Sequence, residues 1–162
     1  MAPQNSRSLR VFMRESAKNE EIVQAPGPDS ILDEDGKPIM LEIKVLSSET
    51  IQKINDNYKT KVIATDKKGQ PYIANGEVAF KVTRDHVKAS QHILAEALVY
   101  PDLRDPELMA FFECNSIAEM PLKVFPRPDE YAHVSQVVMA ALGLSSEPEA
   151  EETSGAIEQA KN

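Results

Sequence analysis

The chain has 162 residues, of which 41% are hydrophobic and 6% aromatic, with no tryptophan, which predicts one domain with an aliphatic core. Its single cysteine, Cys114, excludes an intrachain disulfide and a cysteine-based zinc cage and fits a reducing compartment. The longest apolar run, residues 137–144, is far shorter than the roughly 20 residues of a membrane-spanning helix. No apolar stretch follows the first residues as in a secretory signal. We therefore expect a soluble cytoplasmic protein that does not bind membranes.

The net charge of −8 is unevenly distributed, because residues 145–162 contain five glutamates and one lysine and so carry half of it. An acidic balance disfavours nucleic-acid binding, which depends on basic contacts to phosphates. One local basic cluster indicates a solvated loop face, with a binding patch as the alternative: Lys59, Lys61, Lys67 and Lys68.

The first part of the chain predicts a short helix and a β-hairpin. Residues 1–8 are expected to be a flexible lead-in, and a short amphipathic helix ending near Ala17 is predicted from the helical spacing of Leu9, Phe12 and Met13. Ile22 opens an extended segment, which Pro26–Pro28 interrupts. Asp35-Gly36 suits a tight hairpin turn, and the residues after it alternate as in a half-buried strand: Ile39, Leu41, Ile43 and Val45.

A further helix and a second β segment follow. Ser47 or Ser48 can cap the helix, whose apolar stripe consists of Ile51, Ile54 and Tyr58. Residues 61–82 show short β-like runs on both sides of Asp66–Gln70, which predict either a second hairpin or a mobile loop: Val62–Ala64 and Tyr72–Ala74.

The next two predicted helices are separated by a stiff polar bend. Thr83 is expected to cap a helix that ends before Pro101, with one face formed by Val87, Ser90, Ile93, Leu94, Ala97 and Leu98. Asp105 is expected to cap a short helix that has Pro106 at its first position, where the missing N–H costs nothing.

The remaining elements complete an α+β domain. Ser116 and Glu119 have capping-box spacing, and Pro121 forces a break or a restart of the helix. A last helix is predicted from Pro128 to Gly143, with a buried stripe of Tyr131, Val134, Val138, Ala141 and Leu142. We expect one domain over residues 9–144, in which an N-terminal β-hairpin element packs with a mainly helical C-terminal cluster. Residues 145–162 are expected to form a disordered acidic tail.

No catalytic, cofactor-binding or metal-binding residue is predicted. The six-residue spacing of His86 and His92 does not suit a zinc helix. Asp33–Gly36 resembles the start of a calcium loop, but Lys44 stands at the twelfth position, where the loop needs a glutamate. The glycines are scattered singly, and Cys114 has no local nucleophile signature. We expect a protein that is not an enzyme, with a site assembled only in three dimensions as the alternative.

The helix after Asp105 is the candidate partner-binding element. Its apolar residues cover more of the circumference than one core-facing stripe needs, and we expect Met109 or Phe112 to face outward. Core packing of the aromatic residues, including Phe125 and Tyr131, is the competing interpretation. The residues assigned to partner binding are Leu108, Met109, Phe111 and Phe112. Surface left exposed there would also drive homo-oligomerisation.

The segment Tyr100–Leu108 resembles the central signature of tail assembly chaperones from Gram-positive phages and related defective prophages. That signature is a helix ending in Val-Tyr-Pro-x-Leu, followed by an acidic-capped short helix. Asp33–Ile43 resembles the family's N-terminal strand pair, and Pro128–Gly143 resembles its closing helix. The chain departs from the family at Met40, where an aromatic residue is common.

This resemblance implies a non-catalytic protein of the bacterial host cytoplasm. Such chaperones coat the tape measure protein, are displaced by tail tube protein, and are absent from the finished virion. Many also exist in a frameshift-extended form, which a protein sequence does not reveal. The alternative function is a bacterial protein-binding adaptor or regulatory subunit without catalysis.

The composition of the tail generates a first prediction. Because residues 145–162 contain one large apolar residue, Ile157, truncation after Leu144 is expected to leave the thermal midpoint nearly unchanged. Thermal unfolding of the full and truncated chains measures this. A loss of more than ~5 °C, equivalent to about 1 kcal/mol, would show that the tail docks on the domain.

Overall fold

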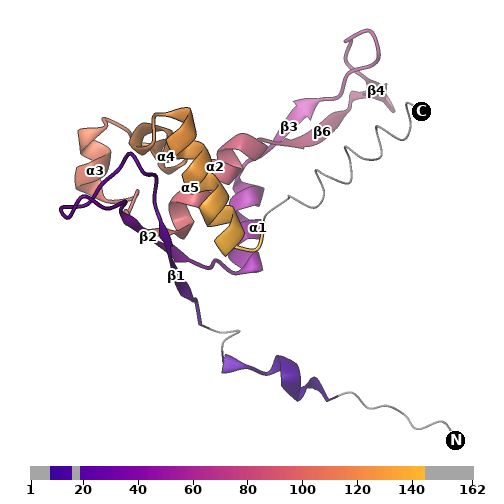
Figure 1. Ribbon diagram of the computed structural model, residues 1–162. Coiled ribbons are helices and arrows are strands. Elements are labelled where there is room, and N and C mark those ends of the chain that lie inside the picture. Colours follow the sequence, from indigo (N-terminus) through magenta and orange to yellow (C-terminus); the bar gives the residue numbers. More distant parts are fainter. Residues whose placement is uncertain (1–7, 16–18, 145–162) are drawn as a thin grey trace, which may run out of the picture.

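The structure, a computed structural model, describes residues 8–15 and 19–144 (Figure 1). The first elements are η1 (Leu9–Phe12), β1 (Ile22–Pro26), β2 (Met40–Lys44), α1 (Ser48–Asn57), β3 (Lys59–Ile63), β4 (Ile73–Ala74), β5 (Glu77–Val78) and β6 (Phe80–Arg84). They are followed by α2 (His86–Ala97), β7 (Leu98–Tyr100), α3 (Pro106–Phe111), η3 (Ile117–Glu119), α4 (Met120–Val124) and α5 (Pro128–Ala141). Strands dominate the first half and helices the second, so the α+β class is confirmed.

The predicted β-hairpin is present as a pair of antiparallel strands, β1 and β2, with Val23 opposite Ile43. The Asp35–Gly36 turn closes the far end of this hairpin beyond an isolated bridge between Leu32 and Pro38. Asp33 Oδ1 accepts hydrogen bonds from the backbone N–H groups of Asp35 and Lys37, at 2.9 and 3.0 Å. Gly36 has φ +78°, the conformation that glycine adopts without steric cost.

A third strand, β7, was not predicted, because the preceding helix was expected to continue to Pro101. The helix instead ends at Ala97, and residues 98–100 pair with β2 in the order β1-β2-β7. A residue before proline is pushed out of the helical region, which favours an extended Tyr100. A register shift between Glu42 and Ile43 lets this short strand fit.

α2 lies at the centre of the core and packs against α1, η3, α4 and α5. Its small residues Ala95 and Ala97 are fully buried, which allows the neighbouring elements to approach closely. One face of β2 adds Leu41 and Ile43 to the same core. The remaining buried residues of this cluster are Leu46, Ile54, Ile93, Leu94, Leu98, Leu103, Cys114, Met120, Phe125, Val134 and Val138.

The start of α2 differs from the sequence prediction. Asp85 caps it, accepting a hydrogen bond from the backbone N–H of Lys88 at 3.1 Å. Thr83, the predicted cap, belongs instead to β6, opposite Thr60. Val87 and Ser90 are exposed rather than buried, because the first turn of α2 emerges from the strand pair before reaching the core.

Three other helix ends test the predicted caps. Ser47 caps α1, and Gly143 follows the end of α5 with its N–H donating to the Ala140 carbonyl, as predicted. Pro121 stands in the first turn of α4, so the predicted restart is confirmed. The Ser116 side chain makes no capping hydrogen bond, so the capping box is wrong; only the backbone turn from Ser116 to Glu119 forms.

The N-terminal prediction is also wrong. η1 is a single 3-10 turn rather than an amphipathic helix reaching Ala17, and Leu9, Phe12 and Met13 are at least 68% exposed. Without a surface to cover this stripe, a short helix lacks the tertiary packing that stabilises most helices. Residues 1–7, 16–18 and the predicted acidic tail lie outside the described residues.

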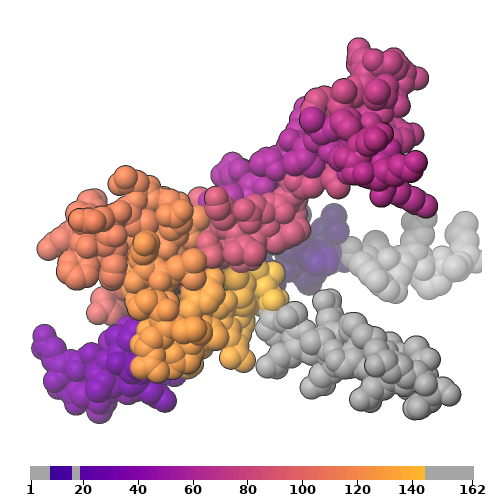
Figure 2. All heavy atoms as spheres, turned by 90° about the horizontal axis from the view of Figure 1, so that it is seen from above, coloured from indigo at the N-terminus to yellow at the C-terminus, as the bar shows by residue number. Residues whose placement is uncertain are grey.

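Residues 59–84 form a β-arm that projects from the body beyond α1 and α2 (Figures 1 and 2). β3 pairs with β6, and β4 with β5, so two turns close the arm. The predicted turn at Asp66–Gln70 is present beside a Thr65–Pro71 bridge. The second turn is Asn75-Gly76, with φ of +53° and +80°, a combination typical of type I′ hairpins. The choice between hairpin and loop is thus decided for the hairpin.

Among the described residues, no helix is long and apolar enough to cross a membrane.

The cap of α3 gives a second prediction. Asp105 Oδ1 accepts a hydrogen bond from the Leu108 N–H at 3.0 Å, as the sequence predicted. Asp105→Ala is expected to lower the free energy of unfolding by ~1 kcal/mol, measured by urea denaturation. Ser116→Ala is the control, because that side chain makes no cap bond, and it should cost less than ~0.5 kcal/mol. Equal costs would contradict the assignment of the cap.

Candidate partner-binding surface

α3 stands at one end of the body, anchored at its N-terminus by Asp105 and at its C-terminus by a tight turn (Figure 1). In that turn the Cys114 N–H donates to the Met109 carbonyl at 3.0 Å, and Glu113 has φ +50°. The helix is only six residues long, so its position depends on side-chain packing.

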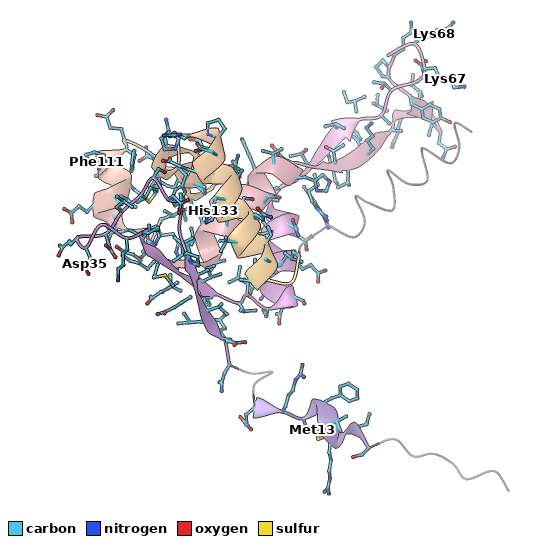
Figure 3. All side chains as sticks on the ribbon, viewed as in Figure 1. Met13, Asp35, Lys67, Lys68, Phe111 and His133 are labelled. Atoms are coloured by element: carbon cyan, nitrogen blue, oxygen red, sulfur yellow. The ribbon has the colours of Figure 1, made fainter. Side chains whose placement is uncertain are left out.

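The four residues predicted to bind a partner do not behave alike. Leu108, Met109 and Phe112 are half-buried and pack against the core. Phe111 is 78% exposed and points away from the body (Figure 3). Its ring meets Phe112 edge-on, with centroids 5.0 Å apart and an interplanar angle of 89°. The expectation that Met109 or Phe112 faces outward is therefore wrong; the helix buries those two and presents Phe111.

A polar cleft of about 380 Å³ lies between the β1–β2 connection and the start of α5. Ser30, Glu130 and His133 line it, the residue types of a nucleophilic triad. The Ser30 hydroxyl donates to Glu130 Oε1 at 2.6 Å, while His133 Nε2 donates to the Pro26 carbonyl at 3.0 Å. Since the serine is directed to the carboxylate and the histidine to the backbone, the two contacts hold the β1–β2 connection and the end of β1 on α5.

A second polar contact joins α1 to α2. The Tyr58 hydroxyl lies 2.8 Å from His92 Nδ1, with the rings edge-to-face at 5.7 Å. Burial lowers the pKa of His92, opposed by the nearby Glu96 carboxylate and reinforced by Arg104. Burial and the charge of Asp85 raise the pKa of Tyr58. A protonated phenol therefore faces a neutral imidazole, and the contact stabilises the packing of α1 on α2.

The three histidines lie in different places. His133 and His92 make the contacts described above, and His86 is exposed at the start of α2. Within residues 8–15 and 19–144, no three His, Cys, Asp or Glu side chains gather in an arrangement that could hold a metal ion.

The β-arm carries a surface that the sequence analysis did not single out. Seven large apolar residues on it are exposed: Val62, Ile63, Tyr72, Ile73, Val78, Phe80 and Val82. The Asn75-Gly76 turn could have indicated the hairpin, but only the structure shows that no element within residues 8–15 and 19–144 covers it.

The profile of a known family, described as phage XkdN-like tail assembly chaperone protein, TAC, matches residues 9–161. The chain belongs to this family. A crystal structure of the protein YqbN is similar, with a TM-score of 0.57, 17% sequence identity, and coverage of 78% of this chain and 88% of that chain. At this identity the likeness concerns the fold alone. No curated protein matches the sequence.

The family resemblance inferred from the sequence is thus confirmed, and the chain is a bacteriophage tail assembly chaperone. Its partners are phage tail proteins, and a chaperone family favours a non-catalytic protein. For such a protein the exposed apolar surfaces at Phe111 and on the β-arm are of greater interest than the polar cleft.

His92 gives the chaperone a pH-dependent stability. Because the pKa of His92 is lowered, the folded protein binds this proton more weakly than the unfolded chain does. The contribution of His92 to the free energy of unfolding is therefore fully present above its ordinary pKa of 6.5 and is lost as the pH falls through its pKa in the folded protein. The free energy of unfolding is expected to fall as the pH drops below the ordinary value of 6.5 toward the lower folded pKa, and to fall less steeply in His92→Gln. Urea denaturation at several pH values measures the slope. His86→Gln, at an exposed position of the same helix, should keep the wild-type slope.

Proposed function

We propose that this chaperone binds the tape measure protein through the α3 surface centred on Phe111, holds it until tail tube protein assembles around it, and is absent from the mature virion. Family membership supports a tail protein as the client. The observation that carries the choice of surface is the 78% exposure of Phe111 on a helix otherwise packed against the core.

The packing of α3 suits it to presenting a single aromatic side chain. Leu108, Met109 and Phe112 fix the helix on the core, so the Phe111 ring is held on a rigid support. An amphipathic client helix offers apolar residues at i, i+3 and i+4, which can surround such a ring. The exposed carboxylates of Glu107 and Glu113 favour client segments in which lysine or arginine flanks the apolar residues.

The size of the contact fits reversible binding. Covering a phenylalanine side chain contributes roughly 2–3 kcal/mol, which alone gives weak affinity. Several copies bound along one long client would together protect it through avidity. Each copy could still be displaced singly by tube protein, which the proposed exchange requires.

The test is capture of the tape measure protein from the same phage. Co-expressed tape measure fragments are expected to copurify with the chaperone, and Phe111→Ser should weaken binding about 10- to 100-fold, from the lost burial of the ring. Isothermal titration with the captured fragment measures the affinity, and circular dichroism checks that the variant is folded.

Val87→Ser is the matched control, since Val87 is 66% exposed on α2 and lies outside the proposed surface. It should bind as the wild type does. Binding that survives Phe111→Ser unchanged would place the client surface elsewhere. Capture of a folded host protein in place of any tape measure fragment would favour the adaptor function.

A further inference from the structure

The β-arm is a ribbon that is two strands wide, and the other described elements give it little support. In the β3–β6 ladder, Lys61 lies opposite Val82 and Ile63 lies opposite Phe80. Directly opposed residues share a face of an antiparallel pair, so Ile63, Phe80 and Val82 form one apolar face, here called the arm face. Their exposed fractions are 49%, 63% and 61%. An isolated ribbon of this kind is only marginally stable in water, and docking of its apolar face would stabilise it.

The arm is basic, although the protein is acidic. Residues 59–84 contain six basic residues and two acidic ones: Lys59, Lys61, Lys67, Lys68, Lys81 and Arg84, with Asp66 and Glu77. Lys59 and Arg84 at the base of the arm are paired with Asp56, at 2.7 and 3.8 Å. Within the described residues, Lys61 has no carboxylate at ion-pair distance, although it borders the apolar arm face.

The surface around α3 has the opposite charge. From Asp102 to Glu119 there are five acidic residues and one arginine: Asp102, Asp105, Glu107, Glu113 and Glu119, with Arg104. Arg104 is itself bound to Glu96, with Nη1 to carboxylate distances of 2.9 and 3.0 Å. The acidic turn at Asp35 lies at the same end of the molecule (Figure 3). Phe111 therefore stands exposed within an acidic surface, here called the α3 end.

We propose that the arm face of one copy docks on the α3 end of a second copy of this chain. The two surfaces match in chemistry, because each presents an exposed phenylalanine and the surrounding charges are opposite in sign. They lie at opposite ends of the molecule, with Phe111 at one end and Lys67 and Lys68 at the tip of the arm (Figures 2 and 3). Within the described part of the chain, the α3 end therefore does not reach the arm face of the same molecule.

This arrangement makes the contact heterologous. A head-to-tail contact leaves one free arm and one free α3 end on every assembly, so copies add in a row unless the rotation closes a ring. The opposite local charges allow this association even though two molecules of net charge −8 repel each other at long range. Salt at moderate concentration should weaken the contact, because the lysine and glutamate side chains remain near solvent.

The inference concerns the free protein and goes beyond the client interaction, although both use Phe111. Self-association is measured without any client, and client binding is measured at concentrations where the chaperone is monomeric. Failure of one therefore does not imply failure of the other.

The first experiment is sedimentation velocity of the full chain over about two decades of concentration. The weight-average mass is expected to rise with concentration at low salt and to fall as salt is added. Phe80→Ser and Phe111→Ser should each raise the dissociation constant at least about tenfold. Phe12→Ser, at another phenylalanine that is 75% exposed, should leave it within about twofold.

Mixing decides the polarity of the contact. Phe80→Ser keeps a native α3 end, and Phe111→Ser keeps a native arm, so the two variants should form one-to-one dimers that grow no further. If Phe111→Ser alone dimerised as strongly as the wild type, the arms would be pairing with each other, and the proposal would be wrong. A chain that stays monomeric at about 0.2 mM and low salt would also overturn it.

Charge reversal tests which face of the arm docks. Lys61→Glu should weaken association about tenfold, and mixing it with Glu107→Lys should restore association, since the arm of each variant then meets an α3 end of opposite charge on the other. Lys81→Glu changes the net charge equally but lies on the opposite face, across from Val62. Equal losses in Lys61→Glu and Lys81→Glu, with no recovery on mixing, would contradict the docking of the arm face.

Discussion

The architecture depends on the point where α2 ends and β7 begins. The helix brings its small buried residues into the middle of the core, and the next three residues hydrogen-bond to β2. One continuous segment therefore fixes the helical cluster to the sheet. The bend at Pro101 then directs the chain to α3, and Leu103, fully buried between them, holds that bend against the core.

Because the chain before α3 is fixed in this way, α3 keeps its position on the core while it exposes an apolar residue. A six-residue helix has little stability of its own, so its position comes from the Asp105 cap and from three apolar side chains packed on the core. The remaining aromatic residue, Phe111, is then free to be exposed. In a family of tail assembly chaperones, such a rigidly supported apolar residue is a reasonable contact for a client.

The β-arm differs from the body in how its apolar residues are placed. The body buries its apolar residues internally, whereas the arm consists of two-stranded sheets that no other described element covers, so its apolar residues are exposed. Basic residues along the ribbon keep it from pairing indiscriminately, as charged residues do on other exposed strands. The chemistry of the arm is complementary to an acidic apolar surface, such as the one proposed here at the α3 end.

Local chemistry was enough to determine several elements from the sequence. Asp105 before Pro106, Ser47 before Glu49, and Asp35 before Gly36 each act within a few residues, so these two caps and the first turn were predicted correctly. The signature around Pro101 likewise led to the right family. The α+β class followed from hydrophobic periodicity, which reflects the same short-range geometry.

Tertiary contacts decided the rest. Leu98–Tyr100 continues a helical apolar pattern; Pro101 favours an extended Tyr100, and the available edge of β2 makes the three residues a strand. Met109 and Phe112 cannot be distinguished from Phe111 by spacing alone, because which residue faces outward depends on how the whole helix rests on the core. The exposure of the arm is decided in the same way, since short β-like runs do not show whether another element covers them, and among the described residues none does.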